Sequence, residues 1–156
     1  MAELRVRGGA AGLRGLPLRP EEIPQIARAL QFAALPTNDL GEPGLHLFAY
    51  EVGGQRIGFG GLELYGPDAL VRSIVVDPVA RGRGFGRKIV DLLAACAREN
   101  GARTAYLLTT DKQEYFKRLG FATSHRDTAP TAIVSSRQMR DLCPASATLM
   151  RLELNH

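Results

Sequence analysis

The sequence predicts a single α/β domain, because buried strands alternate with amphipathic helices along its 156 residues. The clearest unit is a β-branched apolar strand over 70–76, which Pro78 ends and a helix over 85–99 follows. With 45% apolar and 23% charged residues, the chain can bury one core. We therefore expect one domain over 1–156, in which residues 1–10 form either a flexible arm or a small hairpin.

Periodicity and turn residues predict the remaining elements. Residues 20–30 begin with Pro and acidic residues and repeat apolar side chains at helical spacing, which predicts a helix. Gly53-Gly54 separates two strand-like runs by two residues, which predicts a hairpin. Asp111 and Glu114 are spaced as a capping box for a short helix that ends at Gly120. The other expected elements are strands over 13–18, 45–52, 56–65, 104–109 and 148–153, and a loop over 35–44.

The segment between the apolar strand and the long helix has the composition of a phosphate site. Its glycines leave backbone N–H groups uncovered where a helix begins, and the helix dipole attracts anions there. A nucleotide P-loop would need Ser or Thr after Gly-Lys, and a dinucleotide fingerprint would need a third glycine where Arg87 stands. Both alternatives therefore fail. Basic side chains that would strengthen the attraction are Arg81, Arg83, Arg87 and Lys88.

Arg81-x-x-Gly84-x-Gly86 after a strand resembles motif A of the GNAT superfamily of acyl-CoA-dependent N-acetyltransferases, and residues 115–121 resemble its second signature. The resemblance implies a central, mixed but mostly antiparallel sheet of six to seven strands, splayed at the acetyl-CoA site and flanked by about four helices. It also implies acetyl-CoA as co-substrate and no metal. The expected cofactor-binding residues are Ile74, Val75, Val76, Arg81, Gly82, Arg83, Gly84, Phe85, Gly86, Arg87 and Phe116.

Acetyl transfer to an amine requires a base and an acid. Glu63 places a carboxylate on the apolar face of its strand, where an unpaired charge is costly. It is either a base of raised pKa that accepts the amine proton through water, or a structural partner of Arg72 on the neighbouring strand. The superfamily commonly has its acidic tyrosine where this chain has Phe116, which has no proton to donate. Tyr115 is therefore the candidate acid, with water as the alternative.

Over about residues 35–150 the chain resembles N-acetyltransferases associated with bacterial arsenic-resistance operons, which are related to acetylglutamate synthase-like amino-acid acetyltransferases. The resemblance implies transfer to the α-amine of an amino acid or amino-acid-like compound. A guanidinium can hold an α-carboxylate through two hydrogen bonds, so Arg72 is a candidate clamp. The candidate substrate-binding residues are Asn38, Asp39, Arg72, Ser73, Arg126 and Arg137; each arginine could instead form an ordinary ion pair.

Composition argues against other partners. The net charge is +4, but aromatic residues make up 6% of the chain and are not interleaved with basic ones, which disfavours nucleic acid. No apolar run approaches the roughly 20 residues of a membrane span, which predicts a cytoplasmic protein. Cys96 and Cys143 have no clustered partners for a metal. A protein or peptide N-acetyltransferase and a non-catalytic acetyl-CoA- or arsenical-binding module remain alternatives, and an exposed strand over 148–153 would allow a homodimer.

Overall fold

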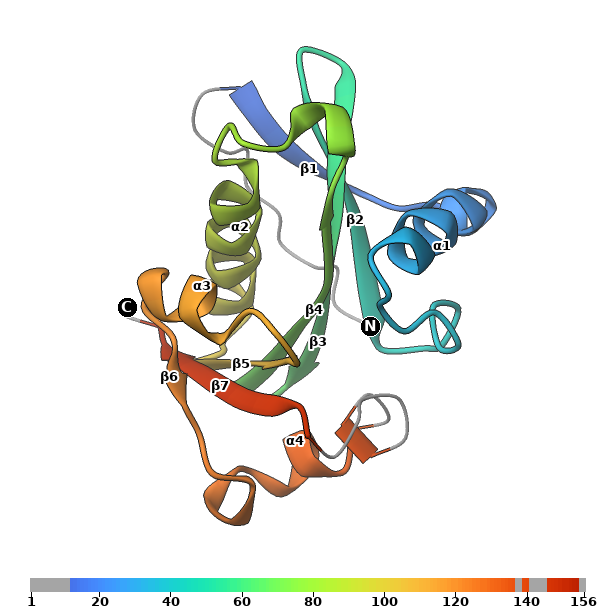
Figure 1. The fold of residues 1–156 in the computed structure, drawn as a ribbon. Helices are drawn as coiled ribbons and strands as arrows, with labels where there is room; N and C mark the ends of the chain where they lie inside the picture. Colours follow the sequence, from blue (N-terminus) through green and yellow to red (C-terminus); the bar gives the residue numbers. More distant parts are fainter. Residues whose placement is uncertain (1–11, 137–138, 141–145, 155–156) are drawn as a thin grey trace.

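The structure, a computed structural model, describes residues 12–136, 139–140 and 146–154. Residues 1–10, Arg137 and Cys143, for which the sequence made predictions, lie outside the described residues. Seven strands form one sheet in the order β1-β2-β3-β4-β5-β7-β6. Its neighbouring strands are antiparallel except for the parallel pair β4–β5, so the predicted sheet is confirmed (Figure 1).

The elements follow each other in nearly the expected order, and the described residues contain four α-helices. The bounds are β1 (Leu13–Pro17), η2 (Pro20–Glu22), α1 (Ile23–Phe32), β2 (Leu45–Val52), β3 (Gln55–Tyr65), β4 (Asp68–Val76), η3 (Pro78–Ala80), α2 (Phe85–Glu99), β5 (Thr104–Thr109), α3 (Gln113–Arg118), β6 (Ala122–Thr123), η4 (Arg126–Thr128), α4 (Thr131–Val134) and β7 (Thr148–Glu153). None of the helices in the described part of the chain is long and apolar enough to cross a membrane.

Glycine determines two of the boundaries that the sequence predicted. Gly53 and Gly54 both have left-handed backbone, with φ of 58° and 81°, as a type I′ hairpin turn between β2 and β3 requires. Gly101, with φ of 97°, follows Asn100 at the end of α2 and lets the chain leave the helix. Both predictions are confirmed.

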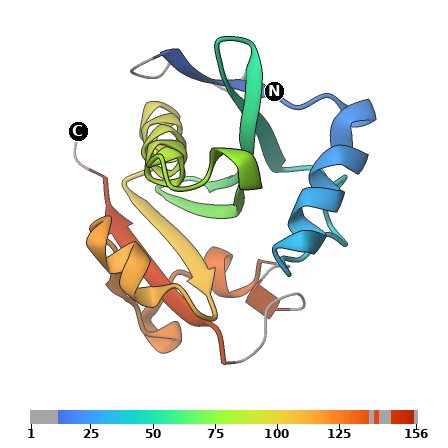
Figure 2. The same ribbon diagram turned by 45° about the horizontal axis from the view of Figure 1, so that its top comes forward.

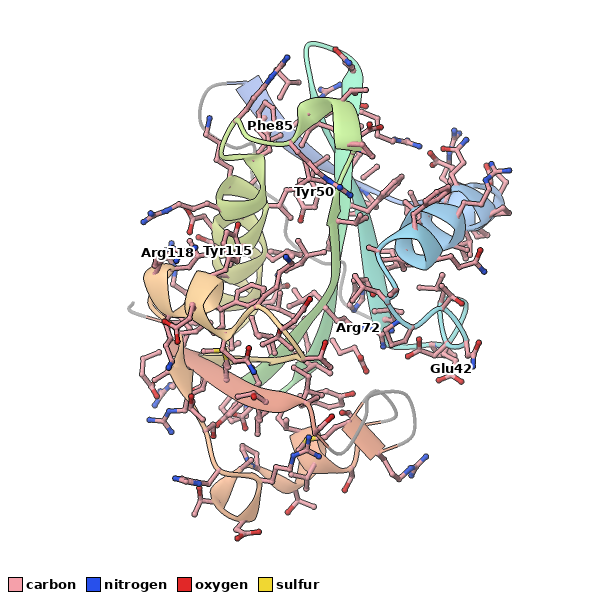
Figure 3. All side chains as sticks on the ribbon, in the orientation of Figure 1. Glu42, Tyr50, Arg72, Phe85, Tyr115 and Arg118 are labelled. Atoms are coloured by element: carbon pink, nitrogen blue, oxygen red, sulfur yellow. The ribbon has the colours of Figure 1, made fainter. Side chains whose placement is uncertain are left out.

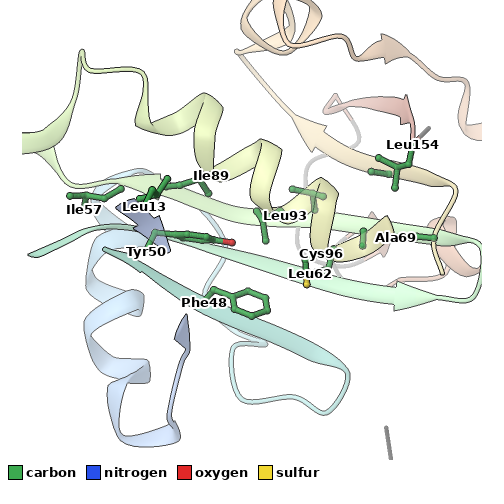
Figure 4. Packing of buried hydrophobic residues seen from close by; sticks show 14 of the residues in the cluster. Leu13, Phe48, Tyr50, Ile57, Leu62, Ala69, Ile89, Leu93, Cys96 and Leu154 are labelled. Carbon is green, nitrogen blue, oxygen red and sulfur yellow. The ribbon is translucent and has the colours of Figure 1, made fainter. Parts of the chain in front are cut away.

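The two faces of the sheet are covered by different helices (Figures 1 and 2). Helix α2 packs on one face, where Ile89 and Leu93 meet Tyr50 in a core cluster (Figure 4). Helix α1 packs on the opposite face through Ile26 and Leu30. Burial of such aliphatic side chains stabilises the fold by about 1.5–3 kcal/mol each. The helices therefore fix the position of β4 from both sides.

Two local predictions are wrong. Asp111 and Glu114 do not form a capping box, since the N-cap position of α3 is Lys112, whose side chain makes no capping hydrogen bond. The Lys112 N–H instead donates to the hydroxyl of Thr109 at 3.0 Å. The strand β7 is not an exposed edge, because it lies between β5 and β6. The two residues of β6 pair with Arg151 and Met150 of β7. Such a short strand carries too little periodicity to be recognised in a sequence.

Candidate active site

The loop before α2 presents backbone N–H groups at the end of β4. Asp77 follows the strand, and its carboxylate accepts a hydrogen bond from the N–H of Val79 at 3.1 Å. Gly82 and Gly84 have left-handed backbone, with φ of 80° and 78°, which favours glycine. Gly84 precedes α2 without any side-chain cap, so the first N–H groups of the helix are available to an anion.

Basic side chains surround this loop. Arg81, Arg83 and Arg87 are exposed, and the Nε of Arg81 donates to the backbone oxygen of Val76 at 3.2 Å. Phe85 is half-buried against the core and anchors the start of α2 (Figure 3). The loop therefore combines a fixed backbone with a positive surface, which is the environment that a phosphate group prefers.

The sheet opens beside this loop. Strands β4 and β5 pair only through Asp68–Leu70 and Thr104–Tyr106, although β4 continues to Val76. The register between β3 and β4 then shifts, and Ser73 has a left-handed φ of 57°. A bulge of this kind bends a strand and is found next to many active sites. The second half of β4, including Ile74, Val75 and Val76, thus has a backbone edge that β5 does not cover.

Tyr115 and Phe116 lie on the far side of this opening. A Cβ added to Gly86 would be 2.7 Å from the Tyr115 hydroxyl and 3.8 Å from Val76, so this hydroxyl lies against the first turn of α2. Phe116 packs edge-on against Phe121, with ring centroids 5.8 Å apart. Burial raises the pKa of Tyr115, so its hydroxyl keeps its proton at neutral pH.

A network of charged side chains lies on the α1 face of the same strands. Arg72 donates from Nη2 to Asp39 Oδ1 at 2.6 Å and from Nη1 to Asp39 Oδ2. The same Nη1 donates to Glu63 Oε2 at 3.1 Å, and the Tyr65 hydroxyl donates to Glu63 Oε1 at 2.5 Å. Arg72 also donates from Nε to the Ser73 hydroxyl at 3.2 Å. Five side chains from the α1–β2 loop, β3 and β4 therefore form one connected group.

Burial differs across this network. The side chains of Arg72 and Asp39 are 1% and 5% exposed, whereas that of Glu63 is 14% exposed. Burial alone would lower the pKa of Arg72, but the hydrogen bonds and charges of Asp39 and Glu63 raise it above its usual value. Burial and the hydrogen bond to Glu63 raise the pKa of Tyr65. Arg72 is therefore charged and inaccessible, and Glu63 is the member of the ion pairs that is open to a ligand.

The predicted substrate residues have different surroundings. Arg72 pairs with Asp39 and Glu63 instead of presenting an open clamp, so the structural pairing of Glu63 and Arg72 is observed. Asn38 is exposed beside the buried Asp39. Arg126 donates from Nη2 to the backbone oxygen of Ala147 at 2.7 Å. Arg137 lies outside the described residues.

Sequence reasoning missed the roles of Asp39 and Tyr65 in this network. The available signal was Arg72 itself, because an arginine within an apolar strand needs anionic partners when it is buried. Asp39 was predicted to bind substrate, but it lies in a loop 33 positions before Arg72, so no pattern indicated that the two side chains pair. Among the residues that the structure describes, no three His, Cys, Asp or Glu side chains gather as metal ligands would.

Comparisons with known proteins support an assignment at the level of the family. The family model described as an acetyltransferase (GNAT) domain matches residues 43–123. Mouse N-alpha-acetyltransferase 80 is 42% identical over 52 residues, which are 33% of this chain and 17% of that protein. The chain therefore matches only a small part of this curated relative.

Two solved structures illustrate the likeness in fold. N-acetylglutamate synthase from Neisseria gonorrhoeae, complexed with coenzyme A and L-arginine, superimposes with a TM-score of 0.75 and 20% identity, over 94% of this chain and 34% of that chain. The ribosomal-protein-S18-alanine N-acetyltransferase from Escherichia coli gives a TM-score of 0.65 and 19% identity, over 92% of this chain and 95% of that chain. At these identities the likeness establishes the fold.

Proposed function

Because the chain belongs to the GNAT acetyltransferase family, we propose that it transfers the acetyl group of acetyl-CoA to the amine of a small, amino-acid-like compound. The observation that carries this proposal is the opening between β4 and β5 directly beside the loop that precedes α2. An acyl carrier needs both an anion site for its diphosphate and a narrow channel for its arm. This part of the chain has uncapped N–H groups at the start of α2 and, close by, a strand edge that β5 does not cover.

The residues around the opening fit acetyl-CoA. The N–H groups of the segment Gly82–Arg87 would hold the diphosphate, since Gly82 and Gly84 carry no Cβ to block its approach. The uncovered backbone of Ile74–Val76 would hydrogen-bond the pantetheine arm, as a strand does with a partner strand. Phe116 would border the arm from the other side. These roles are the predicted ones and are part of the proposal.

In the proposed reaction, one side chain accepts the proton that the amine loses and another protonates the leaving thiolate. The neutral amine nitrogen attacks the thioester carbonyl carbon, the C–N bond forms and the C–S bond breaks, which releases the coenzyme A thiolate. Glu63 takes the proton that the amine must lose, and Tyr115 gives a proton to the departing sulfur. Backbone N–H groups at the Ser73 bulge would stabilise the oxygen of the tetrahedral intermediate.

The choice of substrate class rests on the resemblance to arsenic-resistance-associated and acetylglutamate synthase-like enzymes. The fold similarity to acetylglutamate synthase is compatible with it, although the chain covers 34% of that protein. Amino-acid-like arsenicals, with the carboxylate free or amidated, accordingly belong in the substrate panel. A peptide N-terminus is the competing acceptor, in line with the likeness to the S18-alanine N-acetyltransferase.

Two measurements test the proposal. Calorimetry should detect binding of coenzyme A, and a thiol-release assay should detect turnover of acetyl-CoA with small amines. Replacing Gly84 by Val forces a branched side chain into left-handed backbone and should weaken coenzyme A binding by roughly ten-fold or more.

Gly66→Val is the matched control, because Gly66 also has a left-handed φ, of 65°, but lies in the turn between β3 and β4 with open space around it. Folded wild-type protein that ignores coenzyme A would refute the proposal. If both glycine variants lost coenzyme A binding equally, the loop before α2 would not be the diphosphate site.

A further inference from the structure

We infer that the acceptor carries no free carboxylate next to its amine, because Asp39 already occupies the guanidinium that would bind one. This inference rests on the proposed acetyl transfer and names the chemical class of its acceptor. It makes Asp39 a specificity-determining residue. The class includes simple amines, amino-acid amides and peptide N-termini, which share an ammonium group without an adjacent negative charge.

The geometry of Arg72 is the first argument. A planar guanidinium binds a carboxylate best through two parallel N–H donors. Arg72 makes this bidentate contact with Asp39, from Nη1 to Oδ2 and from Nη2 to Oδ1. Its Nε donates to Ser73 and its Nη1 also reaches Glu63. A substrate carboxylate would therefore have to displace a carboxylate of the chain itself from a site that is 1% exposed.

The charge of the network is the second argument. Arg72 contributes one positive charge, and Asp39 and Glu63 contribute one negative charge each, so the group is net negative. The surplus charge lies at the more exposed end, on Glu63, whose side chain is 14% exposed. An approaching ammonium is attracted to this end, and a carboxylate carried on the neighbouring carbon is repelled.

The surroundings of Arg126, the second arginine predicted to bind a substrate carboxylate, support the same inference. Arg126 was predicted to hold the same carboxylate from the opposite wall of the site. Its guanidinium instead donates to the backbone oxygen of Ala147 at 2.7 Å and ties η4 to the start of β7. Neither arginine that the structure describes for this role is positioned as an open clamp.

The test compares acids with their own amides. The probes are L-alanine, L-glutamate and L-methionine, the corresponding amino-acid amides, ethylamine, and the tripeptide amide Ala-Ala-Ala-NH2. For the wild-type enzyme we expect kcat/KM for each amide to exceed that for its parent acid at least ten-fold. An amino-acid amide is a weaker base than its parent acid and has more unprotonated amine at neutral pH, so kcat/KM is calculated per unprotonated amine. Ethylamine extends the series to a more basic amine without a carboxylate. The tripeptide separates a small-molecule acceptor from a peptide N-terminus.

Asp39→Asn removes the charge that occupies Arg72 and keeps the shape of the side chain. We expect the amide-to-acid ratio to fall at least five-fold, mainly through a lower KM for the acids. Comparing ratios between two enzymes cancels the intrinsic reactivity of each amine. Glu21→Gln is the control, because it removes one negative charge from an exposed side chain outside the network.

The outcomes are separable from those of the proposed function. Wild-type enzyme that acetylates the acids as well as the amides would overturn the inference and leave acetyl transfer intact. If nothing is turned over, the proposed function fails, and calorimetry on the coenzyme A-bound protein then decides the inference by the same acid-to-amide comparison. The wild-type ratio, calculated per unprotonated amine, remains decisive where Asp39→Asn does not fold. Binding of neither the acids nor the amides would also refute the inference.

Discussion

The hydroxyl of Tyr115 leaves no room for a methyl group on Gly86: an added Cβ would lie 2.7 Å from this oxygen. Gly86→Ala should therefore displace the Tyr115 ring toward the opening between β4 and β5. We expect KM for acetyl-CoA to rise about ten-fold, which corresponds to about 1.4 kcal/mol of binding energy. Steady-state kinetics with varied acetyl-CoA measure this change.

A second substitution provides the control for that result. Tyr115→Phe removes the clashing oxygen, so the Gly86→Ala, Tyr115→Phe double variant should recover most of the acetyl-CoA affinity. Its kcat should stay low, because phenylalanine cannot protonate the thiolate. An unchanged KM in Gly86→Ala alone would show that Tyr115 does not border the cofactor.

Glu63→Gln should lower kcat about 10²- to 10³-fold, the usual effect of losing a general base. The amide is isosteric and can still accept the hydrogen bond from Tyr65, so the fold should persist. KM for acetyl-CoA should not change, because the loop that we propose to bind the cofactor lies elsewhere. Glu51→Gln on β2, which loses a partner of the exposed Arg14, is the matched control. Full activity of Glu63→Gln at every pH would leave Glu63 with the structural role alone.

Arg72→Met should lower the free energy of unfolding by about 3–5 kcal/mol, because it strands two carboxylates in a buried site. Arg14→Met is the same substitution in an ion pair where the arginine side chain is 61% exposed. It should lower the free energy of unfolding by less than about 1 kcal/mol. Urea denaturation of both variants measures the difference. Equal losses would mean that the network around Arg72 is not a structural element.

Glu22 should make the attachment of α1 sensitive to acid. Hydrogen bonds from the side chain of Arg56 and the backbone N–H of Arg19 hold the pKa of Glu22 at about 2, below its ordinary 4.5. Its contribution to stability is fully present above pH 4.5 and is lost as the pH falls toward 2, since the unfolded chain takes up the proton first. Thermal melts between pH 7 and 3 should show a shallower decline for Glu22→Gln than for wild type. Glu21→Gln, at an exposed neighbouring site, should follow the wild-type curve.

Local signals predicted the fold well, including the strand and the helix on either side of the glycine-rich loop. Gly53 and Gly54 determined a hairpin, and the apolar run before Pro78 determined the strand that carries the loop, because turn chemistry and periodicity act over a few residues. The predicted capping box at Asp111 was wrong because a motif of a few residues does not show which neighbouring groups compete for the same hydrogen bonds. Its spacing fitted the motif, but α3 has Lys112 as its N-cap, and the Lys112 N–H donates to the hydroxyl of Thr109 at the end of β5.

The substrate side of the site could be predicted only in part. Glu63 and Arg72 were expected to be neighbours, because their strands are adjacent and the alternation of side chains puts both on one face. The partner that decides the role of Arg72 is Asp39, which reaches it from a loop. Contacts between a loop and a strand far along the chain leave no periodic pattern, so only the folded chain reveals them.

The parallel seam between β4 and β5 is three residue pairs long. Such a short joint leaves few backbone hydrogen bonds between the β1–β4 part and the β5–β7 part of the sheet. A cofactor lodged in the gap would bridge both parts as an eighth strand would. Backbone hydrogen exchange in β5 and β7 should therefore slow on saturation with coenzyme A. Slower exchange would show that the bound ligand stabilises the contact between the two parts of the sheet.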